Sequence, residues 1–308
     1  MFPRIHLIIT SLLCCASLTF LLAGCRAGET PQVLTPTKQE VSTSASTSDI
    51  PQGETLTPSP TEIPLAGRVN GIAISLAEYQ AELEMYKATT GAELTVEDEN
   101  RVLEDLVDRA LLAGAAAESG FVVDQALLDE RLENITAKLG GEQPLANWIS
   151  TYGFDEPTFN RALRLSIASA WMRDKIANEI PRLTEQVHAR QILLYDYTTA
   201  QEAFQQLQSG NSFRNLALEY DPITGGDLGW FPRGYLPHPE VEEAVYNLQP
   251  EQYSSIIQTP AGFHIVQLLE KDPQHELSPD ALLVLQNQAL KNWLIQARAK
   301  SQIEVYLP

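Results

Sequence analysis

Helical periodicity in this chain is interrupted between residues 184 and 272. From 75 to 180, and again from 278 to 300, apolar residues recur at the spacing of an amphipathic α-helix. The interrupting stretch alternates short period-two runs with short helical runs, which is typical of a mixed α/β unit with an antiparallel sheet. The last helical run is too apolar to remain exposed, so we expect it to pack on the first helices. The sequence therefore predicts an α+β protein: a mainly helical domain, completed by a C-terminal helix, with an α/β domain inserted into it.

The helical part has clear start and stop signals. Asn70-Gly71 is the expected turn of a short strand pair, and Ser75 is the expected cap of the helix that follows, with Glu78 three residues on. Pro181 ends the helical run. Further helices are expected at 124–139, 143–152 and 155–179.

The remaining elements follow from similar signals. Ser278 is an expected helix cap with Pro279 at the first helical position, and the alternating end of the chain, 302–307, is expected to pair near residues 69–74. In the inserted part we expect, in chain order, a strand at 187–194, a helix at 199–209 capped by Ser or Thr, a helix at 213–220, a glycine-rich turn, a short helix and two strands.

An apolar run near the N-terminus indicates export. Residues 5–23 are almost continuously apolar after Arg4, and the run ends in Leu-Ala-Gly followed by Cys25. This end resembles a bacterial lipobox, which implies cleavage after residue 24 and lipidation of Cys25. The alternative is an uncleaved transmembrane helix, because the run is just long enough to span a bilayer. We expect an extracytoplasmic protein that is lipid-anchored to the bacterial cell membrane.

Residues 25–65 are expected to be a disordered tether. Positions 26–65 contain 19 Ser, Thr or Pro in 40 residues and almost no large apolar side chains. Such a segment cannot bury enough surface to offset the entropy of ordering it. Its expected role is to hold the folded part away from the membrane.

Charge and cysteine content exclude several classes of function. Asp and Glu number 40 against 21 Lys and Arg, a net charge of -19, and no basic cluster offers a surface for nucleic acid. Two of the three cysteines, Cys14 and Cys15, lie in the apolar run, which leaves Cys25 alone outside it. A disulfide framework and a cysteine-based zinc site are thus excluded. We expect no metal and no cofactor.

Three ordered motifs carry a family resemblance. They are VHARQIL at 187–193, GGDLGWF at 225–231 and TPAGFHIV at 259–266. In order and spacing they resemble the signatures of parvulin-type peptidyl-prolyl isomerases. The helical part, with its LEDLVDRALL and ESGFVVD runs, resembles the N-terminal chaperone domain of SurA- and PrsA-type foldases. We therefore expect a SurA-N-like domain at 66–183, a parvulin-like domain at 184–273 and a C-terminal helix and strand at 274–308.

The resemblance implies a peptidyl-prolyl cis-trans isomerase and chaperone that acts on unfolded or partly folded secreted polypeptides containing Xaa-Pro. It implies an apolar slot for the proline ring above a polar floor. Carried over by position, the slot residues are Leu236 and Val241, with Phe263 adjacent, and the floor residues are Gln191, Asp221, Thr259 and His264.

The sequence departs from the parvulin pattern at two places. Gln191 stands where active members usually have a histidine, and Leu236 with Val241 offers less surface than the usual methionine and phenylalanine. Three interpretations of the chain stay open: an isomerase, a client-binding chaperone whose parvulin site is degenerate, and a structural envelope protein that uses these domains as spacers. His264 likewise could be a site residue or a buried histidine satisfied by Thr259.

Overall fold

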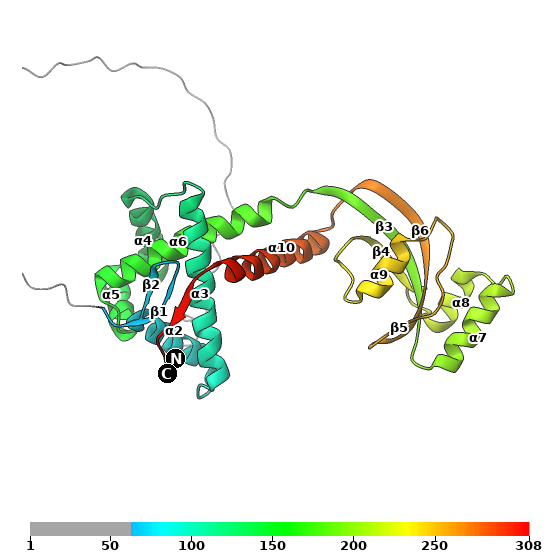
Figure 1. Cartoon of the computed structure of the whole chain (residues 1–308), viewed down its shortest axis with the longest axis horizontal. Coiled ribbons are helices and arrows are strands. Elements are labelled where there is room, and N and C mark those ends of the chain that lie inside the picture. Colours follow the sequence, from blue (N-terminus) through cyan, green and yellow to red (C-terminus); the bar gives the residue numbers. More distant parts are fainter. Residues whose placement is uncertain (1–62, 308) are drawn as a thin grey trace, which may run out of the picture.

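The computed structural model describes residues 63–307 as a helical body and an α/β body, joined by two long strands and one helix (Figure 1). The apolar run, Cys25 and nearly all of the expected tether lie outside the described residues. Within 63–307, no helix is both long and apolar enough to cross a membrane.

Six helices of the described chain form the helical body. Capping side chains define their first turns: Ser75 Oγ accepts a hydrogen bond from Glu78 N at 3.1 Å, as expected, and the Asp155 carboxylate accepts one from Thr158 N at 2.8 Å. The helices are α2 (Leu76–Thr90), α3 (Val96–Glu118), α4 (Gln125–Leu139), α5 (Glu142–Thr151), α6 (Glu156–Asn178) and α10 (Pro279–Lys300).

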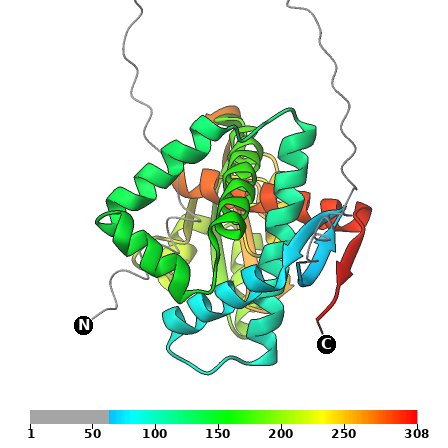
Figure 2. The same ribbon diagram turned by 90° about the vertical axis from the view of Figure 1, so that its left-hand side faces the viewer.

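A small antiparallel sheet closes the helical body, in the order β2-β1-β7. Its strands are β1 (Leu65–Val69), β2 (Ile72–Ser75) and β7 (Ile303–Val305). Asn70 and Gly71 both have positive φ, which makes the tight turn between β1 and β2. Strand β7 pairs with β1 at Gly67–Val69, which confirms the expected pairing of the last strand near residues 69–74. Figure 2 shows the red strand beside the two blue ones.

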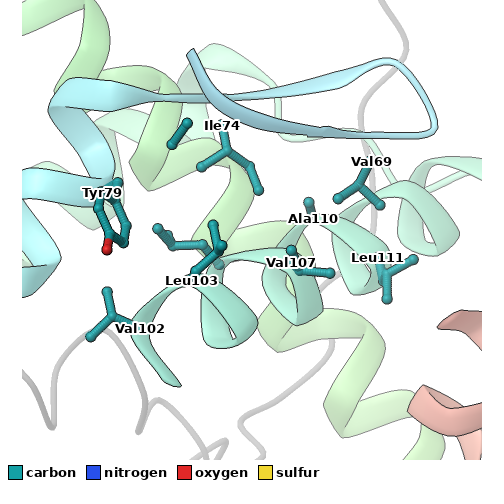
Figure 3. Packing of buried hydrophobic residues seen from close by; sticks show 10 residues of the cluster. Val69, Ile74, Tyr79, Val102, Leu103, Val107, Ala110 and Leu111 are labelled. Atoms are coloured by element: carbon teal, nitrogen blue, oxygen red, sulfur yellow. The ribbon is translucent and has the colours of Figure 1, made fainter. Parts of the chain in front are cut away.

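The sheet packs on α3 through one apolar core. Figure 3 shows the α3 side chains Val102, Leu103, Val107, Ala110 and Leu111 lying opposite residues of the strands and of α2. These α3 positions are spaced at three and four residues and share one face of the helix. The amphipathic pattern of α3 therefore decides where the sheet lies.

Helix α10 is fixed to the helical body at its C-terminal half. Its Leu290 and Trp293 pack against a cluster that includes Met172 and Ile176 of α6. Arg298 donates to Asp108 Oδ1 at 2.7 Å and also pairs with the Glu104 carboxylate, both on α3. As the sequence predicts, the C-terminal helix completes the helical domain.

The α/β body contains a four-stranded antiparallel sheet in the order β4-β3-β6-β5. One face packs against α7 and α8, and the other packs against α9. The elements are β3 (Leu183–Leu194), α7 (Tyr197–Gln208), α8 (Phe213–Tyr220), β4 (Asp227–Pro232), α9 (Pro239–Tyr246), β5 (Ile257–Thr259) and β6 (Gly262–Glu276).

Two local expectations were wrong. The glycine-rich segment includes a strand, β4, which pairs with β3 and buries Phe231 completely. Its glycines hid the strand because glycine is unfavourable in strand interiors. Helix α7 begins two residues before the expected start, and its cap is Asp196, whose carboxylate accepts from Thr199 N at 2.8 Å, rather than Ser or Thr.

We predict that Arg298→Ala destabilises the protein by about 1–3 kcal/mol, because it removes charged hydrogen bonds between α10 and α3. Urea denaturation followed by circular dichroism measures the change. Lys300→Ala removes the same charge from the last turn of α10 and should cost less than about 0.5 kcal/mol. Equal losses in the two variants would contradict a specific role for Arg298.

Candidate active site

The two central strands bring two of the expected floor residues, Gln191 and His264, together. Strands β3 and β6 are neighbours, with Leu193 opposite His264 and Gln191 opposite Val266. Alternate residues of a strand share a face. His264 and Gln191 therefore lie on the same face as Ala189 and Val266, which is the face covered by α9.

Three polar side chains form a hydrogen-bonded chain on this face. His264 Nδ1 lies 3.0 Å from Gln191 Oε1, and His264 Nε2 lies 2.9 Å from Thr259 Oγ1. His264 is only 3% exposed. With the Gln191 oxygen as acceptor, Nδ1 carries the proton and donates, and Nε2 accepts from the Thr259 hydroxyl. Both ring nitrogens of a buried neutral imidazole are thus satisfied.

The surroundings of His264 favour its neutral form. Burial lowers the pKa of His264 below its usual value of 6.5, and the nearby His238 lowers it further, whereas Glu240 acts in the opposite direction. The His238 and His264 rings are 5.7 Å apart between centroids. The His264 imidazole is consequently neutral at neutral pH.

Asp221 organises the loop that precedes β4. Its carboxylate accepts from Ile223 N and Thr224 N, each at 3.1 Å, and pairs with the Thr224 hydroxyl. These bonds hold the pKa of Asp221 below its usual range, the Thr224 side chain contributing most. The same carboxylate accepts from Gly226 N at 3.3 Å. Asp221 thus fixes the loop between α8 and β4.

Gly226 brings that loop against the floor strand. Gln191 N donates to Gly226 O at 2.8 Å, and a Cβ on Gly226 would lie 1.8 Å from the Gln191 carbonyl oxygen. No residue with a side chain fits there, because the backbones of β3 and the loop are in direct contact. The glycine motif therefore places Asp221 and Gln191 in adjoining segments.

The expected slot residues are divided between the two faces of the sheet. Val241, 3% exposed, and the half-buried Leu236 belong to the cluster on the α9 face. Phe263 precedes His264 on β6 and packs in the cluster of α7 and α8, with its ring 5.3 Å from that of Tyr197. The structure thus brings Leu236 and Val241 together and places Phe263 on the other side of β6.

The structure adds residues that the sequence pattern did not single out for this site. His238, in the Pro-His-Pro segment, lies beside His264, and Leu228 of β4 packs in the same cluster as Leu236 and Val241. Glu242 is buried and holds the loop that carries Leu236. Of these residues, only Glu242 could have been noticed in the sequence, because it is an acidic residue next to the apolar Val241.

Comparison with known families agrees with this geometry. Residues 194–270 match the model of the PPIC-type PPIase domain, and residues 58–163 match that of the SurA-like N-terminal domain. The α/β body is therefore a parvulin-type peptidyl-prolyl cis-trans isomerase domain, and the helical body is SurA-like.

Proteins similar to this chain include foldases and a chaperone. The foldase protein PrsA of Halalkalibacterium halodurans is 28% identical over 261 residues, 77% of this chain and 72% of that protein. The chaperone SurA of Nitrosococcus oceani is 29% identical over 244 residues, 68% of this chain but only 56% of SurA. The crystal structure of PrsA from Bacillus cereus is 21% identical, with a TM-score of 0.43, and the match covers 77% of this chain and 86% of that one.

The chain belongs to the SurA/PrsA type of foldases with a parvulin-type domain. As such it is a peptidyl-prolyl cis-trans isomerase and a chaperone that assists protein folding. The expected family and fold class are confirmed.

We predict that His264 titrates below pH 6.5 in the folded protein. Below pH 6.5 the imidazole is protonated to a greater extent in the unfolded chain than in the folded protein. The free energy of unfolding therefore falls as the pH falls through this range. NMR titration of the imidazole and urea denaturation from about pH 5 to 8 measure both effects. A midpoint above 6.5 would contradict a buried neutral ring.

Proposed function

We propose that this site accelerates rotation about Xaa-Pro peptide bonds. The proline ring enters between Leu236 and Val241, and the floor beneath it is formed by Gln191, Thr259 and His264. The observation that supports this most strongly is the continuous chain of hydrogen bonds through buried His264, at 3.0 and 2.9 Å. An ordinary core would fill this face with apolar side chains, because burying polar groups is costly.

The reaction forms and breaks no covalent bond, so the site has only to favour a twisted amide over a planar one. The uncatalysed barrier is about 18–20 kcal/mol. An apolar slot excludes the water that stabilises the planar resonance form, and fixed dipoles stabilise the redistributed charge of the twisted amide. A neutral His264 suits this role, since an imidazolium under the slot would draw water toward it.

Gln191 preserves the floor although it replaces the usual histidine. Its side-chain oxygen accepts the Nδ1–H of His264, which is the only hydrogen bond that the imidazole needs on that side. Asp221, one loop away, supports the Gln191 backbone through Gly226. This geometry favours the isomerase over the alternative, a client-binding chaperone with a degenerate parvulin site.

If this proposal is correct, catalysis depends on His264. We predict that His264→Ala lowers kcat/KM at least about tenfold, a loss of about 1.4 kcal/mol of transition-state stabilisation. A proline-limited refolding assay and a protease-coupled peptide assay measure it. His188→Ala is the matched control: His188 lies on β3 but pairs with Asp227 rather than with the floor, and its loss should leave activity unchanged.

Substitutions of Gln191 distinguish an active isomerase from a client-binding chaperone with a degenerate site. Gln191→Leu, which leaves the Nδ1–H without a partner, should lower kcat/KM at least about tenfold, whereas Gln191→His should stay within about threefold of the parent. A parent protein without isomerase activity, combined with a large gain in Gln191→His, would support the degenerate-site alternative.

The helical body offers a place for client side chains, which the chaperone role requires. A cavity of about 490 Å³ lies between α2, α3, α6 and α10. Apolar side chains of Met85, Leu106 and Leu112 line it together with the charged side chains of Asp105 and Arg173. Such a mixed lining suits unfolded segments of varied sequence better than one fixed ligand.

We propose further that the protein is lipid-anchored through Cys25 on the extracytoplasmic side of the cell membrane, where its clients are secreted polypeptides. The lipobox-like end of the apolar run supports the anchor. The proposed units are the signal at 1–24, the tether at 25–65, the chaperone domain at 66–183 with its completion at 274–308, and the isomerase domain at 184–273.

Cys25→Ser tests the anchor. The parent should partition into the detergent phase of Triton X-114 and into the membrane fraction, because several acyl chains hold it there. The variant should lose lipid labelling and keep an uncleaved leader. Equal incorporation of labelled fatty acid by both proteins would rule out lipidation at Cys25.

A further inference from the structure

The loop between β4 and α9 carries one wall of the slot. This loop, residues 233–238, contains Leu236 and also His238, whose ring lies 5.7 Å from that of His264. The opposite wall, Val241, lies on α9. The width of the slot is therefore set by how this loop lies relative to α9.

Glu242 fixes the loop to α9. It is only 8% exposed, and its carboxylate accepts from three successive backbone N–H groups: Gly234 at 2.7 Å, Tyr235 at 3.0 Å and Leu236 at 3.2 Å. Hydrogen bonds to a charged acceptor are stronger than neutral ones. Glu242 follows Val241 on α9 and is hydrogen-bonded to the loop that carries Leu236. The two walls of the slot are therefore connected through Glu242.

The other side of the loop touches α10 of the helical body. Gln288 Nε2 donates to Gly234 O at 2.5 Å, and Tyr235 packs against a cluster formed by Leu277, Ala281 and Leu282. Gly234 has a φ of +82°, and a Cβ there would lie 2.7 Å from Gln288 Oε1. The glycine thus permits both the turn and the close approach of α10. In Figure 1 the loop before α9 reaches the end of α10.

Helix α10 links this contact to the cavity of about 490 Å³ in the helical body, where we propose that client side chains bind. Leu290, one half-turn beyond Gln288, lines the cavity of the helical body and packs with Met172 and Ile176. The same helix therefore meets the slot loop with one set of side chains and the client cavity with another. Displacement of α10 cannot leave the loop unaffected, because Gln288 and Tyr235 both attach to it.

We propose that Gln288 is a positioning residue for the proline slot, through which α10 of the chaperone body holds the Leu236 wall at its working distance from Val241. This inference rests on the proposed slot. Gln288 lies on α10, outside the cluster that contains Leu236 and Val241. It acts through Gly234 and the loop, so its loss loosens the slot without removing any slot side chain.

The test compares two glutamines of α10 in the full chain. Gln288→Ala removes the bond to the slot loop, and Gln286→Ala removes a similar bond, at 3.2 Å, to the Ala177 carbonyl of α6. We expect Gln288→Ala to raise the KM for an Xaa-Pro tetrapeptide, and its Kd, three- to tenfold with a smaller change in kcat. Gln286→Ala should leave both constants unchanged. Gln288→Lys, whose ammonium can donate to the same carbonyl, should restore most of the affinity.

The outcomes separate this inference from the proposed function. A parent protein that binds the tetrapeptide without isomerising it would refute catalysis, and the Kd values of the two variants would still decide the role of Gln288. Equal constants for Gln288→Ala, Gln286→Ala and the parent would overturn the inference, and so would a parent that does not bind the peptide. Equal Tm values for the two alanine variants would show that general destabilisation does not cause the effect.

Discussion

The antiparallel pairing of β3 with β6 is the interaction on which the rest of the structure depends. It runs from Leu183 opposite Glu276, at the helical body, to Leu194 opposite Phe263, beyond the site. Because the chain enters and leaves the α/β body along paired strands, this body can be inserted without disturbing the helical one. The same ladder brings Gln191 and His264 onto one face. Architecture and site therefore share one set of backbone hydrogen bonds.

The floor of the site shows how polar groups are accommodated in a small sheet. A buried imidazole is tolerated when both of its nitrogens are paired, because an unpaired buried polar group costs about 1–3 kcal/mol. Thr259 and Gln191 supply these partners. Burial favours the neutral ring. In the proposed site, glutamine can therefore stand in place of a second histidine, because its side-chain carbonyl oxygen accepts the Nδ1–H of His264.

The two bodies are joined by more than a linker. Strand β3 follows α6, and strand β6 precedes α10. Helix α10 also makes side-chain contacts with the loop at residues 233–238. Under the proposed function, the helical body binds an unfolded client and the α/β body acts on its prolyl bonds. A fixed geometry between the two bodies would then raise the effective concentration of the prolyl bond at the second site.

Local sequence signals determined most of the elements and the family. Caps such as Ser75 and Ser278 act within one helical turn, and the three parvulin motifs are short segments, so both can be read without knowledge of the fold. They predicted the α+β class, the insertion and the return of the last strand to β1. The lipobox-like segment that ends at Cys25 is equally local and stays a prediction.

Only the tertiary structure decided which side chains meet. Strand β4 exists because β3 supplies hydrogen-bonding partners that outweigh the poor strand propensity of Gly229. Strand alternation separated Phe263 from Leu236, and folding of the Pro-His-Pro segment brought His238 to His264. The contacts of Glu242 and Gln288 with the loop join residues by packing rather than by pattern. Such contacts depend on the relative placement of whole elements, which local propensity does not encode.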